Sequence, residues 1–139
     1  MSRTETAVIL ILRFIGVTGL FALPAVFMPI EWMSIIHSYA GLGELPEGPI
    51  VAYLARSLSG FYAAFAAITL YISFDIRQYR GFVRLWGVLF VLMGCLLLGI
   101  DLVAGMPAPW TLLEGPPTIA VGIAVLWLQA AIDKGRPAE

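Results

Sequence analysis

Four apolar stretches, each about as long as a membrane crossing, take up most of this chain and constrain its fold more than any other feature. A transmembrane helix needs ~20 consecutive, mostly apolar residues. Hydrophobic residues make up 60% of the 139 positions and charged residues 12%, whereas soluble domains are about 45–50% apolar. We therefore expect an all-α integral membrane protein, a four-helix transmembrane bundle that forms one domain over residues 1–139, with spans near residues 7–28, 50–74, 82–104 and 115–132.

The segment between the first two stretches, residues 29–40, has the pattern of a short helix that lies in the membrane interface. Its apolar residues recur at helical spacing, and Trp32 is of a residue type that anchors helices at the interface. Residues 41–49 contain three glycines and two prolines, which is typical of a turn-rich loop. We expect a short interfacial helix followed by this loop.

The lysines and arginines outside the apolar stretches are unevenly placed. They lie before the first span, beside the second-to-third connection or after the last span, as Arg3, Arg77, Arg80, Arg84, Lys134 and Arg136. The other two connections carry acidic residues instead. Because cytoplasmic loops collect lysine and arginine, we expect a multi-pass protein with both termini in the cytoplasm.

Two further arginines interrupt the apolar stretches. Arg13 lies in the first and Arg56 in the second, and an arginine at the bilayer centre costs roughly 2.5–3.5 kcal/mol on insertion scales. Arg13 lies near the level of Asp75, and we expect these two residues to form a structural charge pair. Arg56 belongs to a helical row with Ala52, Gly60 and Ala64. Because small residues favour close helix packing in membranes, we expect Arg56 to point inward.

Charged residues of different spans are expected to meet in the outer half of the membrane. At ~1.5 Å per helical residue, Arg56 lies roughly 9 Å below the outer surface, and its planar fork of donors suits a carboxylate, sulfate or phosphate. The candidate ligand-binding residues are Arg56, Asp101, Glu114, His37, Trp110 and Tyr53. The same charges would also satisfy one another in a purely structural group that fixes the helix register. Both interpretations stay open.

Other kinds of site find little support in the composition. Cys95 is the only cysteine and His37 the only histidine, so we expect no disulfide within the chain and no metal site. The formal net charge of −1 argues against a nucleic-acid partner. No catalytic residues are assigned, and we expect binding rather than catalysis.

Three short segments resemble the DoxX-like group of small four-helix bacterial membrane proteins. They are Leu12-Arg13-Phe14, the run from Tyr53 to Tyr62 around Arg56, and Gly99-Ile-Asp101 followed by Leu113-Glu114-Gly115. The resemblance implies a four-helix fold in a bacterial inner membrane. Some members of that group are associated with quinone-linked sulfur oxidation or redox complexes, so it also implies a connection to quinone or to a partner protein.

The function that we expect is the binding of a small amphipathic or anionic ligand, quinone- or lipid-like, in a polar pocket in the outer half of the bundle. Membrane lipid is the expected partner, together with a homo-oligomer or a larger membrane complex in which the chain is an accessory subunit. One alternative is an oligomeric transporter or channel. Others are a membrane enzyme that uses His37, Asp101 and Glu114 for acid–base chemistry, and a scaffold whose charges only fix packing.

Overall fold

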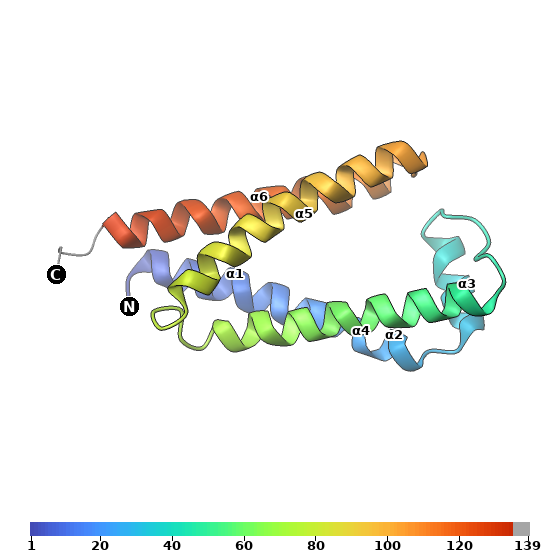
Figure 1. The fold of residues 1–139 in the computed structure, drawn as a ribbon, viewed down its shortest axis with the longest axis horizontal. Coiled ribbons are helices and arrows are strands. Elements are labelled where there is room, and N and C mark those ends of the chain that lie inside the picture. Colours follow the sequence, from blue (N-terminus) through green and yellow to red (C-terminus); the bar gives the residue numbers. More distant parts are fainter. Residues whose placement is uncertain (135–139) are drawn as a thin grey trace. The chain divides into compact units, whose positions relative to one another are not determined.

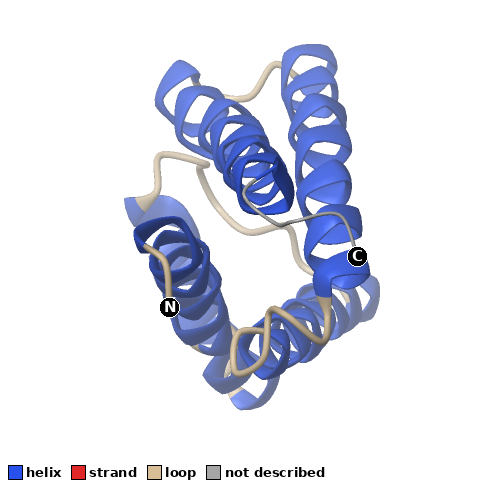
Figure 2. Ribbon diagram, turned by 90° about the vertical axis from the view of Figure 1, so that its left-hand side faces the viewer, coloured by secondary structure: helices blue, strands red, loops and turns tan. Residues whose placement is uncertain are grey.

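The computed structural model describes residues 1–134, which form helices and no strand (Figures 1 and 2). The helices are α1 (Arg3–Leu20), α2 (Leu23–Phe27), α3 (Ile30–Tyr39), α4 (Pro49–Ile72), α5 (Arg80–Ala104) and α6 (Ala108–Lys134). Four segments are long and apolar enough to cross a membrane, namely α1 together with α2, then α4, α5 and α6. The predicted all-α fold, with four membrane-length segments and a short helix between the first two, is confirmed.

The helices form two compact units. The α3–α4 unit contains residues 14–70, which are the end of α1, then α2, α3 and nearly all of α4. The α5–α6 unit contains residues 1–13 and the described chain from residue 71 onward, and so includes the start of α1. The single domain expected over residues 1–139 stays a prediction.

Pro24 divides the first apolar stretch into two helices. α1 ends at Leu20, and α2 begins at Leu23 with the proline in its first turn. Proline lacks an N–H donor, and inside a longer helix its ring would clash with the carbonyl four residues earlier, which belongs to Leu20. The first turn of a new helix tolerates it because the N–H groups there have no intrahelical partner.

The last helix begins before the expected span. α6 begins at Ala108, so Pro116 and Pro117 lie inside the helix rather than in its first turn. Each of these prolines removes one backbone hydrogen bond to a carbonyl four residues earlier. The Thr118 hydroxyl, directly after them, donates to the carbonyl of Glu114 at 2.7 Å.

A glycine seam joins α5 to α6. Gly87 and Gly94 on α5 and Gly115 and Gly122 on α6 are each spaced by seven residues, two helical turns, and so face one side of their helix. A Cβ built at Gly94 would lie 2.9 Å from the carbonyl oxygen of Gly115, and one at Gly122 would lie 2.8 Å from that of Gly87. These helices therefore pack backbone to backbone, as small residues allow in membranes. Gly105, with φ of 68°, ends α5 and begins the turn into α6.

A second close contact holds α1 against α4 within the α3–α4 unit. A Cβ at Gly16 would lie 2.8 Å from the Cβ of Leu70, and one at Gly19 would lie 2.7 Å from the Cβ of Ala66. Both glycines sit in the part of α1 that precedes the break at Pro24. This contact places one end of α4 beside α1. The other end, which begins at Pro49, lies beside the loop and α3 instead.

Candidate functional site

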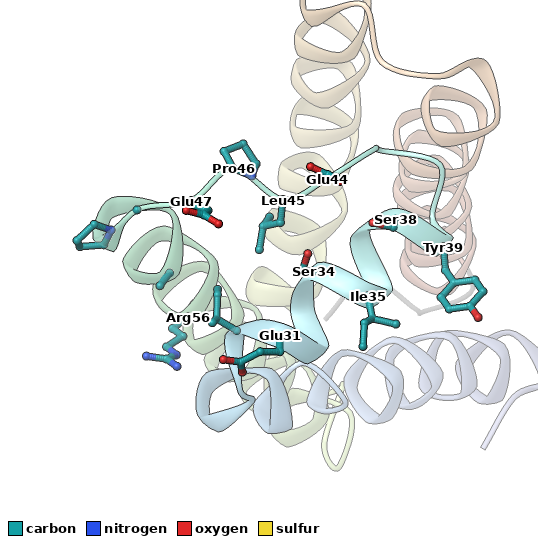
Figure 3. Close-up of a pocket in the computed structure, with 14 residues that line it drawn as sticks. Glu31, Ser34, Ile35, Ser38, Tyr39, Glu44, Leu45, Pro46, Glu47 and Arg56 are labelled. Atoms are coloured by element: carbon teal, nitrogen blue, oxygen red, sulfur yellow. The ribbon is translucent and has the colours of Figure 1, made fainter.

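A cavity of about 1200 Å³ lies between α3, the loop after it and the start of α4, all within the α3–α4 unit (Figure 3). Its charged lining consists of three carboxylates and one guanidinium, those of Glu31, Glu44, Glu47 and Arg56. The rest of the lining is mixed, with the hydroxyls of Ser34 and Ser38 beside the apolar side chains of Ile30, Ile35, Leu45 and Pro46.

Two changes of chain direction, one before α3 and one after it, form this cavity. Pro29 directly precedes α3, after an extended Met28 with ψ of 138°. Gly41 and Gly43 then adopt φ of 76° and 81°, values that glycine adopts without strain. These turns bring the loop back toward α4, which begins at Pro49.

Two side chains at the end of α3 hold the loop in place. The Nδ1 of His37 and the Oγ of Ser38 each lie 3.0 Å from the carbonyl oxygen of Gly43. Because a carbonyl only accepts hydrogen bonds, both side chains donate, and His37 carries a proton on Nδ1. His37 thus positions the loop and is not among the residues that line the cavity.

Arg56 does not point into a helix interface, contrary to the prediction from its row of small residues. It shares a helix face with the buried Ala63, two turns further along α4, but Arg56 itself is exposed. The reason is that α1 has already ended at this level, and the nearest atom to a Cβ built at Gly60 is Cγ2 of Val26 at 4.0 Å. The guanidinium instead donates one hydrogen bond, at 3.3 Å, to the carbonyl of Met28.

Of the residues predicted for the ligand site, the structure gathers only some within one unit. Arg56 lines the cavity, His37 holds its loop, and Tyr53 is exposed on α4 and outside the lining. The predicted set of ligand-binding residues did not include the three carboxylates that share the cavity with Arg56. The signal for Glu44 and Glu47 was their place in a turn-rich loop before the helix that carries the arginine.

The other predicted residues belong to the α5–α6 unit. The indole N–H of Trp110 donates to a carboxylate oxygen of Glu114, one helical turn later, at 2.7 Å. Asp101 is buried at 4% exposure, and within residues 1–134 its Oδ2 has no hydrogen-bond partner. Leu98 faces Gly115 across the glycine seam, so one turn toward the α5–α6 connection on both helices puts Asp101 and Thr111 at a similar level.

At the other end of this unit, Arg13 and Asp75 do not form the predicted charge pair among the described residues. The guanidinium of Arg13 lies 5.4 Å from the ring centroid of Phe74, a cation–π contact. Asp75 accepts a hydrogen bond from the backbone N–H of Gln78 at 3.0 Å. Each of the two residues thus has another partner in the described chain.

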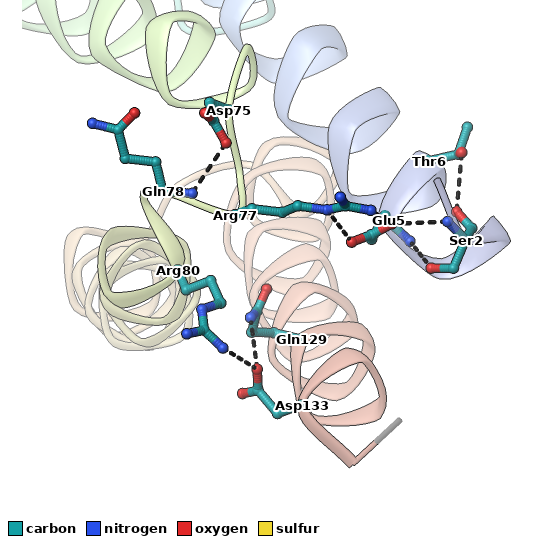
Figure 4. Close-up of polar contacts among 9 residues, drawn as sticks. All are labelled: Ser2, Glu5, Thr6, Asp75, Arg77, Gln78, Arg80, Gln129 and Asp133. Atoms are coloured by element: carbon teal, nitrogen blue, oxygen red, sulfur yellow. Dashed lines mark hydrogen bonds and ion pairs between the residues drawn. The ribbon is translucent and has the colours of Figure 1, made fainter. Parts of the chain in front are cut away.

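Among the described residues, three ion pairs that sequence reasoning missed lie near the start of α1 and the end of α6. Figure 4 shows the pairs of Arg77 with Glu5 and of Arg80 with Asp133. Arg77 binds Glu5 through two hydrogen bonds of 2.8 and 3.0 Å, and this pairing raises the pKa of the Arg77 guanidinium above its usual value. Ser2 and Glu5 also form a capping box, since each side chain accepts the other's backbone N–H. Arg84 binds Asp133 at 2.8 Å. The spacing Ser-x-x-Glu before an apolar run was the sequence signal for the capping box that positions Glu5.

Among the described residues, no three histidine, cysteine or acidic side chains lie in an arrangement that could hold a metal ion. Comparisons with protein-family models, with curated proteins and with solved structures found no match to this chain. The cavity between α3 and α4 is therefore the candidate site on its geometry alone.

Proposed function

We propose that this chain is a multi-pass protein of the bacterial inner membrane that binds a small amphipathic, lipid- or quinone-like ligand in the cavity between α3 and α4. Four membrane-length segments support the membrane location. The predicted resemblance to DoxX-like proteins is consistent with a bacterial source. The distribution of lysine and arginine favours cytoplasmic termini, which would place the cavity on the outer side of the membrane.

The observation that carries this proposal is the mixed lining of the cavity. Ligand pockets are commonly concave, of about 300–1,000 Å³, and mostly apolar with a few polar groups that fix the ligand's orientation. This cavity, at about 1200 Å³, has room for such a ligand. Ile30, Ile35 and Leu45 would contact its apolar part, and Arg56 and the carboxylates would contact its polar end.

Arg56 is suited to this role because most of its donors are uncommitted. A guanidinium has five N–H donors, and Arg56 uses one of them on the Met28 carbonyl. None of the three cavity carboxylates forms an ion pair with it in the part of the chain that the structure describes. Arg56 would therefore bind a carbonyl or an anionic group of a ligand without first breaking a salt bridge.

The test is native mass spectrometry of protein extracted gently from membranes, as wild type, Arg56→Gln and Arg13→Gln. Arg13 is the matched control, because it is also an exposed arginine of a membrane-length helix but does not line the cavity. We expect a bound small molecule on the wild type and on Arg13→Gln, and its loss from Arg56→Gln. A wild type that carries no small molecule would overturn the proposal. The same spectra report subunit number, and so test the proposed homo-oligomer or larger complex.

A further inference from the structure

The cavity has an excess of negative charge. Three carboxylates, those of Glu31, Glu44 and Glu47, face one guanidinium, that of Arg56. An anionic ligand would gain the attraction of the arginine and be repelled by three acidic groups. The expected ligand was amphipathic or anionic, and the complete lining of the cavity disfavours a ligand that carries only negative charge.

We propose that the polar end of the ligand carries a protonated amine in addition to a phosphate, as in a zwitterionic phospholipid of the ethanolamine type. This inference rests on the proposed ligand site between α3 and α4 and names the ligand's chemical class. The phosphate would bind Arg56, whose planar fork matches phosphate geometry. The ammonium would bind the carboxylates, each of which accepts hydrogen bonds from an N–H donor.

The placement of the charges agrees with a headgroup of two opposite charges. Figure 3 shows the side chains of Arg56 and Glu31 at one side of the cavity and that of Glu44 at another, with Ser34 between Glu31 and Glu44. The carboxylates thus lie at more than one side of the cavity, and none of them forms an ion pair with Arg56 among the described residues. A headgroup that brings both a negative and a positive group would satisfy both kinds of residue at once.

The apolar lining suits the part of a phospholipid next to its headgroup. Ile30 and Ile35 of α3 line the cavity and are exposed. Trp32, on the same short helix, is 62% exposed, and tryptophan prefers the level of the lipid headgroups. A helix with these residues would lie where the glycerol and the first methylenes of the chains meet the headgroup.

The experiment titrates purified protein in detergent micelles with phosphatidylethanolamine or phosphatidylglycerol and counts bound lipids by native mass spectrometry. Exposed ion pairs are individually weak, so the carboxylates together should give phosphatidylethanolamine about a tenfold preference over phosphatidylglycerol. The double variant Glu44→Gln/Glu47→Gln should lose most of this preference. The matched control is Asp75→Asn, an exposed carboxylate outside the cavity, which should keep it.

A second arm separates a zwitterionic lipid from a simple cationic amphiphile. Arg56→Gln should weaken binding of phosphatidylethanolamine but not of dodecylammonium, which has an amine and no phosphate. Unchanged phosphatidylethanolamine binding in Arg56→Gln would overturn the zwitterion assignment. Equal or tighter binding of phosphatidylglycerol to the wild type, lost in Arg56→Gln, would overturn the amine while leaving the ligand site in place. Failure of every lipid and of dodecylammonium to bind would overturn the site itself.

Discussion

The glycine seam between α5 and α6 makes a sharp prediction about one added methyl group. In Gly94→Ala the new Cβ would lie 2.7 Å from Cγ1 and 2.8 Å from the backbone nitrogen of Ile119, and 2.9 Å from the carbonyl oxygen of Gly115. Two of these three atoms belong to the backbone of α6, so a rotamer change cannot relieve the overlap. The two helices would have to move apart, and overpacking of this kind costs typically 1–3 kcal/mol.

Gly99→Ala is the matched control for this prediction. Gly99 lies on the same helix, and a Cβ built there meets nothing within 4 Å. Alanine in place of glycine in a helix interior gains about 0.8–1.0 kcal/mol of helix propensity, and both variants share that gain. The control should therefore be neutral or stabilised, and Gly94→Ala should be less stable than the control by about 1–3 kcal/mol, the overpacking cost alone.

The assay is unfolding of the purified protein in mixed micelles with increasing sodium dodecyl sulfate, followed by circular dichroism. The difference between the two variants is the measured quantity, because both make the same chemical change on one helix. Equal unfolding midpoints for Gly94→Ala and Gly99→Ala would refute the backbone-to-backbone packing of α5 and α6. A lower unfolding midpoint for Gly99→Ala than for Gly94→Ala would refute this packing as well.

Three further predictions concern single side chains. Asp101→Leu should leave the unfolding midpoint unchanged or raise it, because a buried acceptor without a donor costs about 1–3 kcal/mol; a clear fall in the midpoint would mean that the Asp101 carboxylate has a partner. The hydrogen bond between the hydroxyls of Tyr71 and Tyr79, at 3.0 Å, raises the pKa of Tyr79. Tyr71→Phe should therefore lower the pKa of Tyr79, and the phenolate absorbance of Tyr79 should develop at lower pH than in the wild type. An unchanged titration would count against that hydrogen bond. His37→Ala should speed amide hydrogen exchange in the loop around Gly43, because it removes one of two side-chain donors to the Gly43 carbonyl. An unchanged exchange rate would show that the loop keeps its conformation without the His37 hydrogen bond.

The fold was largely predictable because membrane crossing depends on length and composition, which are local properties of a sequence. The break at Pro24 follows from the missing donor of proline. The prolines near the start of α6 were harder to place, because both positions, first turn or interior, occur when other contacts satisfy the helix. In the described chain, glycines of α5 and α6 bring those two helices into close backbone contact, whereas Gly60, in the small-residue row of α4, has no atom nearer to its built Cβ than 4.0 Å. Small-residue spacing identifies helix faces that permit close approach, and the partner helix decides which face is used.

The candidate site was predictable only in part, because it depends on which residues a loop brings together. Depth along a helix singled out Arg56 as a candidate, and it gave no information on the direction of its side chain. The cavity carboxylates come from α3 and from a loop whose course is set by two glycines with positive φ and by a carbonyl that accepts two hydrogen bonds. Such turns are visible in a sequence as a glycine-rich segment, but their direction is not.

The two arginines inside the apolar stretches show how a charge in a membrane protein can be held without a carboxylate. Arg13 lies over the face of Phe74, and Arg56 donates to the free carbonyl of Met28 at the end of α2. Among residues 1–134, neither arginine forms an ion pair with a carboxylate. For Arg13 the positive charge faces an aromatic ring, and the residue does not line the cavity between α3 and α4. For Arg56 it borders a cavity whose carboxylates are also free of ion pairs in the described chain. Opposite charges that share a cavity without pairing are an arrangement that a ligand with both charges would complete, and this is the reason to test Arg56 before any other residue of the protein.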